Sequence, residues 1–284
     1  MKTHSAASPA RVSVHGGHSR AYCNHAQDDL EEILKQYIRE GFKWVGITEH
    51  MPPVNDRFRY PDEIEAGLTA QSMYDRFERY MEECRRLQKK YASDITLYAA
   101  FETETYSGSL SLVRDLREKY RPDYLLGSVH HVDDIPIDMD PAQYHRAAEQ
   151  AGGLDALYCR YFDLQYEMIE TLTPRVVAHF DLIRIFDPDY RNRLEKPPIL
   201  ERIQRNLTLI QERNLILDFN VRSLLKGAVE PYISRSILQQ ALEMSIPVIP
   251  GDDSHSIGTV GLNIDRGIAM LTEMGFDTQW RRPA

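Results

Sequence analysis

Cysteine and long apolar runs are scarce in this sequence. It has three cysteines, Cys23, Cys84 and Cys159, and their odd number and wide spacing exclude both a disulfide framework and a CxxC zinc knuckle. Such cysteine usage is typical of a reducing compartment, so we expect a cytoplasmic protein. No apolar run approaches the ~20 residues that cross a bilayer, and the N-terminus lacks a signal-peptide stretch. We therefore expect no membrane partner.

Positive charge is also in short supply. Lys and Arg number 34 against 43 Asp and Glu, which gives a net charge of −9. Proteins that hold a phosphate backbone need a basic surface, so we expect no nucleic-acid partner. The length of 284 residues allows two ordinary domains or one α/β barrel of roughly 250 residues. Because no linker or repeat divides the chain, we expect a disordered tail over residues 1–10 and one domain over 11–284.

What the chain does contain is a regular alternation of short β-branched or aromatic runs with longer amphipathic stretches. This alternation is typical of βαβ units with a parallel sheet, and seven units favour a closed α/β barrel. No dinucleotide-type glycine motif follows the first run, which argues against an open sheet of that kind. We predict that residues 131–151 form a loop over one barrel end. The predicted strands are 11–14, 43–48, 95–101, 124–129, 175–178, 215–219 and 247–249. The predicted helices are 28–40, 71–91, 110–120, 154–171, 198–213, 233–244 and 260–274.

Ligand-type side chains end six of the seven predicted strands. In parallel α/β barrels the C-terminal strand ends meet at one face, where active sites are built. Two further histidines, His18 and His25, follow the first strand, whereas Cys23 between them has no partner at ligand spacing. The strand-end residues are His15, His50, Glu102, His130, His179 and the pair Asp253 and His255.

So many imidazoles and carboxylates at one barrel mouth predict bound metal ions. Without cations, many of these polar groups would be buried and short of hydrogen-bond donors. Histidine nitrogen and carboxylate oxygen suit Zn, Mn and Fe. With three or four protein ligands for each ion, we predict two or three divalent cations.

Five segments, in this order and spacing, make the sequence similar to a known family. They are GITEH (46–50), GSVHHV (127–132), AHFD (178–181), LDFN (217–220) and GDDSH (251–255). Together they resemble the polymerase and histidinol phosphatase (PHP) family, over roughly residues 11–262. The stretch SVHHVDDIPIDMD and the glutamate after the third strand resemble its histidinol-phosphatase branch. The resemblance implies a distorted (β/α)7 TIM-like barrel with a trinuclear metal cluster.

The resemblance also assigns ligands and leaves two choices open. The family motif Asp-x-His-x-His is replaced by SVHGGH (13–18), so either or both of its histidines could bind. The closing motif offers Asp252 or Asp253, and alignment on His255 favours Asp253. Asp181 could orient an imidazole as a carboxylate outside the ligand shell. The implied ligands are His15, His18, Glu102 and Asp253 for the first ion, His130 and His179 for the second, and His25, His50 and His255 for the third.

These residues predict a metal-dependent phosphomonoesterase. Metal-activated hydroxide would attack the phosphorus of a small ester, which the resemblance identifies as L-histidinol phosphate in histidine biosynthesis. Asp253 would hold the proton of the attacking water, and His255 would protonate the leaving alkoxide. The alternatives are another small phosphomonoester such as phosphoserine, a PHP-type nuclease or phosphodiesterase, and a non-catalytic metal-binding protein. Candidate phosphate clamps are Arg160, Arg184, Arg222 and Lys226, and acidic residues at 133–140 could meet a cationic substrate.

Overall fold

The computed structural model describes residues 8–284, so most of the expected tail lies outside the described residues. Ala10, the last residue of the expected tail, is hydrogen-bonded to the C-terminal segment of the domain. The indole nitrogen of Trp280 donates a hydrogen bond to the Ala10 carbonyl oxygen at 2.7 Å. None of the helices in the described part combines the length and hydropathy needed to cross a membrane.

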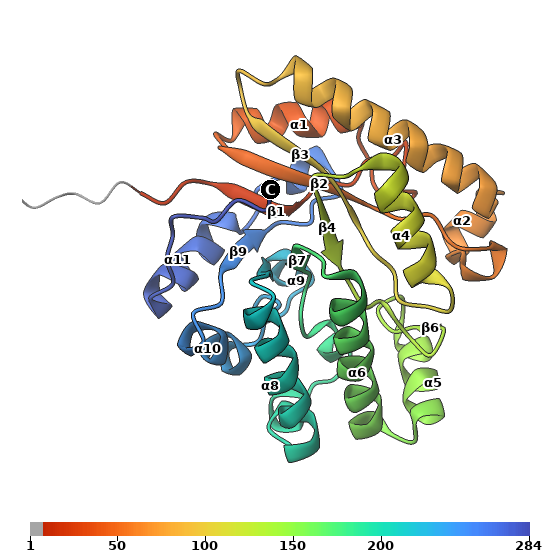
Figure 1. The fold of residues 1–284 in the computed structure, drawn as a ribbon, viewed down its shortest axis with the longest axis vertical. Coiled ribbons are helices and arrows are strands. Elements are labelled where there is room, and N and C mark those ends of the chain that lie inside the picture. The colour runs from red at the N-terminus through yellow and green to blue at the C-terminus, as the bar shows by residue number, and fades with distance from the viewer. Residues whose placement is uncertain (1–7) are drawn as a thin grey trace, which may run out of the picture.

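Seven strands form one sheet in which chain order and spatial order are the same (Figure 1). Every paired neighbour runs parallel. Each strand overlaps one of the predicted runs, and the first and last strands of the sheet lie against each other, so the predicted barrel is confirmed. The strands are β1 (Val12–Gly16), β2 (Trp44–His50), β3 (Thr96–Glu102), β4 (Tyr124–Gly127), β7 (Val176–Val177), β8 (Ile216–Asn220) and β9 (Val248–Gly251).

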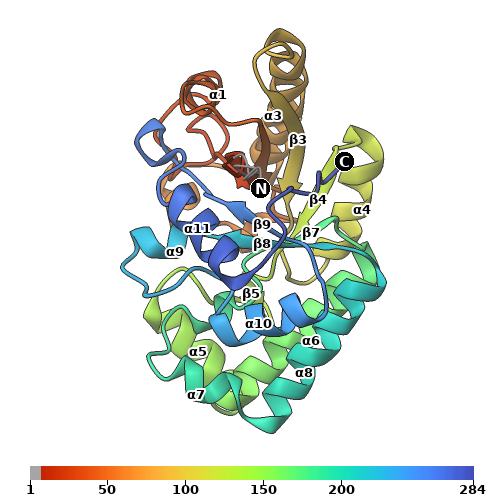
Figure 2. The same ribbon diagram turned by 90° about the vertical axis from the view of Figure 1, so that its left-hand side faces the viewer.

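Helices surround the sheet on its outer side, as the two views in Figures 1 and 2 show. Seven of them match the predicted amphipathic stretches to within a few residues. The helices are α1 (Leu30–Arg39), α2 (Pro61–Glu65), α3 (Ala70–Lys90), α4 (Ser109–Tyr120), α5 (Pro141–Ala151), α6 (Leu154–Leu172), α7 (Tyr190–Leu194), α8 (Pro197–Glu212), α9 (Arg222–Leu225), α10 (Arg235–Glu243) and α11 (Ile264–Met274), with 3-10 turns η1 (Asp56–Phe58), η2 (Leu182–Arg184) and η3 (Ile257–Thr259).

The prediction of a loop over residues 131–151 was wrong. The segment contains a small hairpin, β5 (His131–Val132) with β6 (Ile135–Pro136), and then the helix α5. The helix begins because the Asp140 carboxylate accepts a hydrogen bond from the Gln143 amide at 2.9 Å and Pro141 fits the first turn. It ends at Gly152, whose φ of 92° lies in the left-handed region.

The barrel interior is apolar at its lower end and polar at its mouth. Inward-facing side chains of β3 alternate along the strand: Tyr98 and Ala100 belong to the interior cluster, and Glu102 follows at the mouth. The interior is tight enough to demand glycine at one position. A Cβ on Gly46 would lie 1.6 Å from the Tyr124 hydroxyl oxygen. Because apolar side chains fill this end of the barrel interior, the ligand-type side chains lie at the opposite end, the mouth.

The barrel is closed at its mouth by the loops that follow the first and last strands. The Asp253 amide donates to the His15 carbonyl oxygen at 2.8 Å, and the His18 amide donates to the Ser254 carbonyl oxygen at 2.7 Å. These bonds hold together two motifs that lie more than two hundred residues apart in the sequence. The histidines after β1 therefore face the aspartate and histidine after β9.

Candidate metal centre

Glu102, the last residue of β3, lies at the centre of the barrel mouth. Its carboxylate oxygens lie 2.9 Å from Nε2 of His179, 3.3 Å from Nε2 of His130, 3.4 Å from Nδ1 of His50 and 3.5 Å from Nε2 of His15. Its side chain is 2% exposed. One buried carboxylate thus contacts imidazoles from four different strand ends, which places it where it could bridge cations.

A local irregularity in β1 directs His15 into the mouth. The pairing register with β2 shifts between Ser13 and Gly16, which turns the His15 side chain towards the barrel axis. Nδ1 of His15 lies 2.9 Å from Oδ2 of Asp218, a residue of β8, so Nε2 is left facing Glu102. The neighbouring strand must come close here, because a Cβ on Gly251 would lie 2.7 Å from the His15 Cβ.

Of the two aspartates in the closing motif, the structure brings Asp253 to the mouth. Its Oδ1 lies 3.4 Å from Nε2 of His18 and 3.8 Å from Nε2 of His15. Asp252 instead accepts hydrogen bonds from the hydroxyls of Ser13 at 2.6 Å and Tyr37 at 2.8 Å. This geometry agrees with Asp253 as the ligand, and Asp252 anchors the loop.

The second group of ligand atoms lies between β4 and β7. Nε2 of His130 and Nε2 of His179 are 3.3 Å apart, with Glu102 beside them. The backbone of His179 has a positive φ of 23°, a conformation that residues other than glycine and asparagine rarely adopt. Glu104, which the sequence analysis missed, lies 3.1 Å from Nδ1 of His130 and 3.3 Å from Nδ1 of His131. Glu104 therefore orients His130, and it also contacts the ring of His131.

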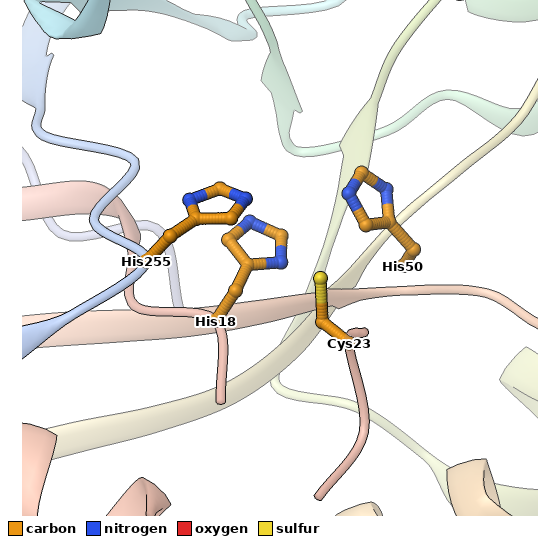
Figure 3. A group of neighbouring side chains, drawn as sticks. All are labelled: His18, Cys23, His50 and His255. Atoms are coloured by element: carbon orange, nitrogen blue, oxygen red, sulfur yellow. The ribbon is translucent and has the colours of Figure 1, made fainter. Parts of the chain in front are cut away.

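The third group contains a cysteine. One ligand-type atom from each of His18, Cys23, His50 and His255 lies within 4.8 Å of the others (Figure 3). We call these four residues the Cys23 cluster. His25, the predicted ligand here, lies beside the cluster: its side chain is 53% exposed and its Nε2 is 3.2 Å from the Cys23 sulfur. The assignment of His25 as a ligand stays a prediction.

The unpaired atoms at the mouth fit divalent cations. Buried polar atoms in folded proteins are almost always hydrogen-bonded, and orphans cost free energy. Here several of them point into one small region, and nitrogen, oxygen and sulfur donors together suit Zn and related ions. The buried atoms without a hydrogen-bond partner among the described residues include His15 Nε2, His18 Nε2, His50 Nδ1, Glu104 Oε1 and His179 Nδ1.

The electrostatics of the mouth follow from this crowding. Burial lowers the pKa of His15, but the carboxylates of Asp253, Glu102 and Asp218 outweigh burial and raise it to about 10. Burial raises the pKa of Glu102, but His15 and His130 outweigh it and hold that pKa well below its usual range. In the absence of cations, protons on imidazoles therefore balance the negative carboxylates.

Metal binding should consequently release protons. His15 carries a proton near neutral pH, because its pKa is about 10, and a nitrogen must lose its proton to bind a cation. We expect Zn²⁺ added to the metal-free protein to release at least about one proton per molecule. Titration calorimetry in buffers of different ionisation enthalpy measures this number. A binding heat that is independent of the buffer would contradict the prediction.

Asp218 should act by positioning His15. Replacing it with asparagine removes the charge that holds Nδ1 of His15, so we expect a 10–100-fold loss of metal affinity. The matched control is Asp123→Asn, because Asp123 pairs with Arg85 before β4, at the opposite end of the barrel. Metal affinity can be measured by competition with a chromophoric chelator. Equal affinity in the two variants would rule out this role.

A cavity of about 370 Å³ is lined by ligand-type side chains of the barrel mouth, among them Glu102, His179 and Asp253. Arg222 and Lys226 both line it, and a guanidinium nitrogen of Arg222 lies 3.9 Å from Oδ2 of Asp253. The other two predicted clamps do not reach it. Arg160 forms an ion pair with Asp133 at 2.7 Å, in a separate surface pocket. Arg184 is buried against Asp181 at 3.1 Å and donates to two backbone carbonyl oxygens.

Asp181 does not orient an imidazole as predicted. Its carboxylate accepts hydrogen bonds from Arg184 and from the amide of Ser234 at 2.9 Å. Asp218 and Glu104 hold imidazoles instead. A signal for both was present in the sequence, because each lies two residues from another inward-facing polar residue, Asn220 and Glu102 respectively.

Fold and site together define a parallel α/β barrel with a multi-histidine, multi-carboxylate centre, an arrangement suited to metal-dependent hydrolysis. The chain belongs to the PHP domain family, whose family model matches residues 16–222. A Schizosaccharomyces pombe protein named probable histidinol-phosphatase is 34% identical over 268 residues, 93% of this chain and 87% of that protein. The Bacillus subtilis histidinol-phosphatase is 26% identical over 255 residues, 84% of this chain and 92% of that protein.

Two solved structures are similar in fold. The Listeria monocytogenes protein hisK matches with a TM-score of 0.78 at 23% identity, covering 90% of this chain and 99% of that one. The Lactococcus lactis histidinol phosphate phosphatase, complexed with Zn, L-histidinol and phosphate, matches with a TM-score of 0.72 at 16% identity, covering 94% of each chain. At these identities the likeness shows the shared (β/α)7 barrel.

Proposed function

We propose that this protein is a metal-dependent histidinol-phosphate phosphatase that converts L-histidinol phosphate and water to L-histidinol and phosphate in the cytoplasm. The observation that carries the proposal is the set of converging ligand atoms around Glu102, directly below a cavity with two basic side chains. The relatives named histidinol-phosphatase align with most of the chain, which supports the same substrate. Residues 11–284 would act as one domain.

The chain's own groups supply most of the chemistry. Arg222 and Lys226 would hold the phosphate, and their position in the lining of the cavity, with Arg222 beside Asp253, supports this role. Asp253 would take the proton of the attacking water, and His255, whose Nδ1 lies 3.5 Å from Asp253, would pass that proton on to the leaving alkoxide. Two or three divalent ions, of Zn, Mn or Fe, would supply charge stabilisation and lower the pKa of a water towards 7.

The acidic segment at 133–140 offers one free carboxylate to a cationic substrate. Asp133 pairs with Arg160, Asp134 accepts from the Ser107 amide at 2.7 Å, and Asp140 caps α5. Asp138 lines the cavity instead, and its Oδ1 is buried without a partner among the described residues. A half-buried carboxylate in this position favours an ester that carries an ammonium or imidazolium group and no carboxylate. It disfavours phosphoserine, whose own carboxylate would be repelled, and a nucleotide.

Asp138→Asn tests this recognition. We expect the KM for histidinol phosphate to rise about tenfold more than the KM for phenyl phosphate, because only the first substrate carries a cationic ammonium group. The control variant is Asp134→Asn, whose carboxylate faces Ser107 and Arg57. Steady-state phosphate release measures both constants. A parallel change in the two KM values would show that Asp138 does not recognise the cation.

The decisive experiment measures phosphate release from histidinol phosphate, phosphoserine and a short oligonucleotide, with and without a chelator. Chelator-sensitive release from histidinol phosphate well above that from the other two supports the proposal. Preference for phosphoserine would replace the substrate, and cleavage of the oligonucleotide would make the protein a nuclease. Bound metal without turnover of any substrate would make it a non-catalytic metal-binding protein.

A further inference from the structure

The thiol of Cys23 lies among three imidazoles at the barrel mouth. Cys23 belongs to the loop between β1 and α1, and Figure 3 shows its sulfur facing the rings of His18 and His50. The residue is 6% exposed and forms no disulfide with the other cysteines of the described chain. A buried cysteine normally packs against apolar side chains, so this polar setting is unusual for an inert thiol.

The histidines around the thiol fit a bound cation independently of the cysteine. His18 is fully buried, and its Nε2 forms no hydrogen bond within residues 8–284, although Oδ1 of Asp253 lies 3.4 Å away. Nδ1 of the same ring lies 3.2 Å from Oε2 of Glu49, which fixes the ring orientation. A carboxylate on one ring nitrogen with the other nitrogen left free is the usual arrangement of a metal-binding histidine.

The rings also lie close enough to act together with the sulfur. The centroid of His18 is 4.2 Å from that of His255 and 4.7 Å from that of His50. His18 lies between His255 and Cys23 in Figure 3. One ligand atom from each of the four residues lies within 4.8 Å of the others, which matches the span of one coordination sphere with metal–ligand bonds of about 2.0–2.3 Å.

We propose that Cys23 is a ligand of the cation held by the Cys23 cluster, so that this cation has one sulfur donor beside its imidazole donors. On binding, the S–H bond breaks, a sulfur–metal bond forms and the proton passes to solvent. A thiolate favours Zn²⁺ or Co²⁺ over Mn²⁺ at this position. The proposal rests on the metal-dependent function above and adds a ligand that the strand-end pattern did not contain.

Cobalt provides a test that does not depend on turnover. The metal-free protein is loaded with Co²⁺, and a thiolate ligand then produces a sulfur-to-cobalt charge-transfer band in the near ultraviolet. We expect this band in the wild-type protein and its loss in Cys23→Ser, with circular dichroism confirming the fold. Cys159→Ser is the matched control and should keep the band, because Cys159 lies on α6 outside the cluster.

The outcomes separate this proposal from the proposed function. A wild-type protein that binds cobalt and hydrolyses histidinol phosphate without the band would overturn the cysteine ligand alone. A band that persists in Cys23→Ser would do the same. A protein that binds no divalent ion would overturn both. A second readout is competition between Zn²⁺ and Mn²⁺, in which Cys23→Ser should lose the preference of one site for Zn²⁺.

Discussion

Glu102→Gln should lower kcat/KM for histidinol phosphate by roughly 10³-fold or more. Glutamine keeps the size of the side chain but removes the charge that faces His15, His50, His130 and His179 at 2.9–3.5 Å. It also places an NH₂ group against nitrogens that would have to bind cations. Both the metal content and the stabilisation of charge on the phosphate depend on this one carboxylate, so its loss is expected to remove nearly all activity.

Metal analysis and steady-state kinetics on the purified variant check this result. Glu118→Gln is the matched control, because Glu118 lies exposed on the outer helix α4. His179→Ala should also abolish activity while leaving the fold intact, since His179 lies at the end of a barrel strand and not in the apolar floor. Full activity and full metal content in Glu102→Gln would refute the central role of this carboxylate.

Removing the metal should have the second large effect. We expect exhaustive chelation to reduce phosphate release to background and to lower the thermal midpoint by roughly 10 °C, because ligands that bind only the folded state stabilise it by about 4 kcal/mol at a thousand times their Kd. Added Zn²⁺ or Mn²⁺ should restore both properties. Differential scanning calorimetry and phosphate assays measure them, and unchanged activity after verified metal removal would exclude the proposed mechanism.

The metal-free protein should also respond to pH in a defined direction. His15 has a pKa of about 10 in the fold and 6.5 as its ordinary value, so its protonated form favours folding. That contribution is complete below pH 6.5 and is lost as the pH rises through about 10. The midpoint of the metal-free protein should therefore fall between these pH values more steeply than that of the metal-loaded protein.

Much of the fold could be predicted from the sequence because its signals are local. Each strand is a short β-branched or aromatic run and each long helix an amphipathic stretch, so periodicity alone located both. The helix within residues 131–151 was not predicted, because its start depends on Asp140 and Pro141. Taken alone, these two residues are equally typical of a loop. The ligand positions followed from a further general property of parallel barrels, whose strand ends share one face.

The order of residues along the chain is enough to show that ligand-type residues such as Glu102 and His179 end the strands, and hence that they meet at one barrel mouth. Which side chains contact one another there follows only from the three-dimensional arrangement. Asp218, and not Asp181, contacts an imidazole. Arg184 donates its hydrogen bonds to buried groups, whereas Arg222 lines the cavity. Cys23 lies among the imidazoles. Strand periodicity depends on residues that are neighbours in the sequence. These contacts instead join residues up to about two hundred positions apart, and they depend on how each loop turns after its strand.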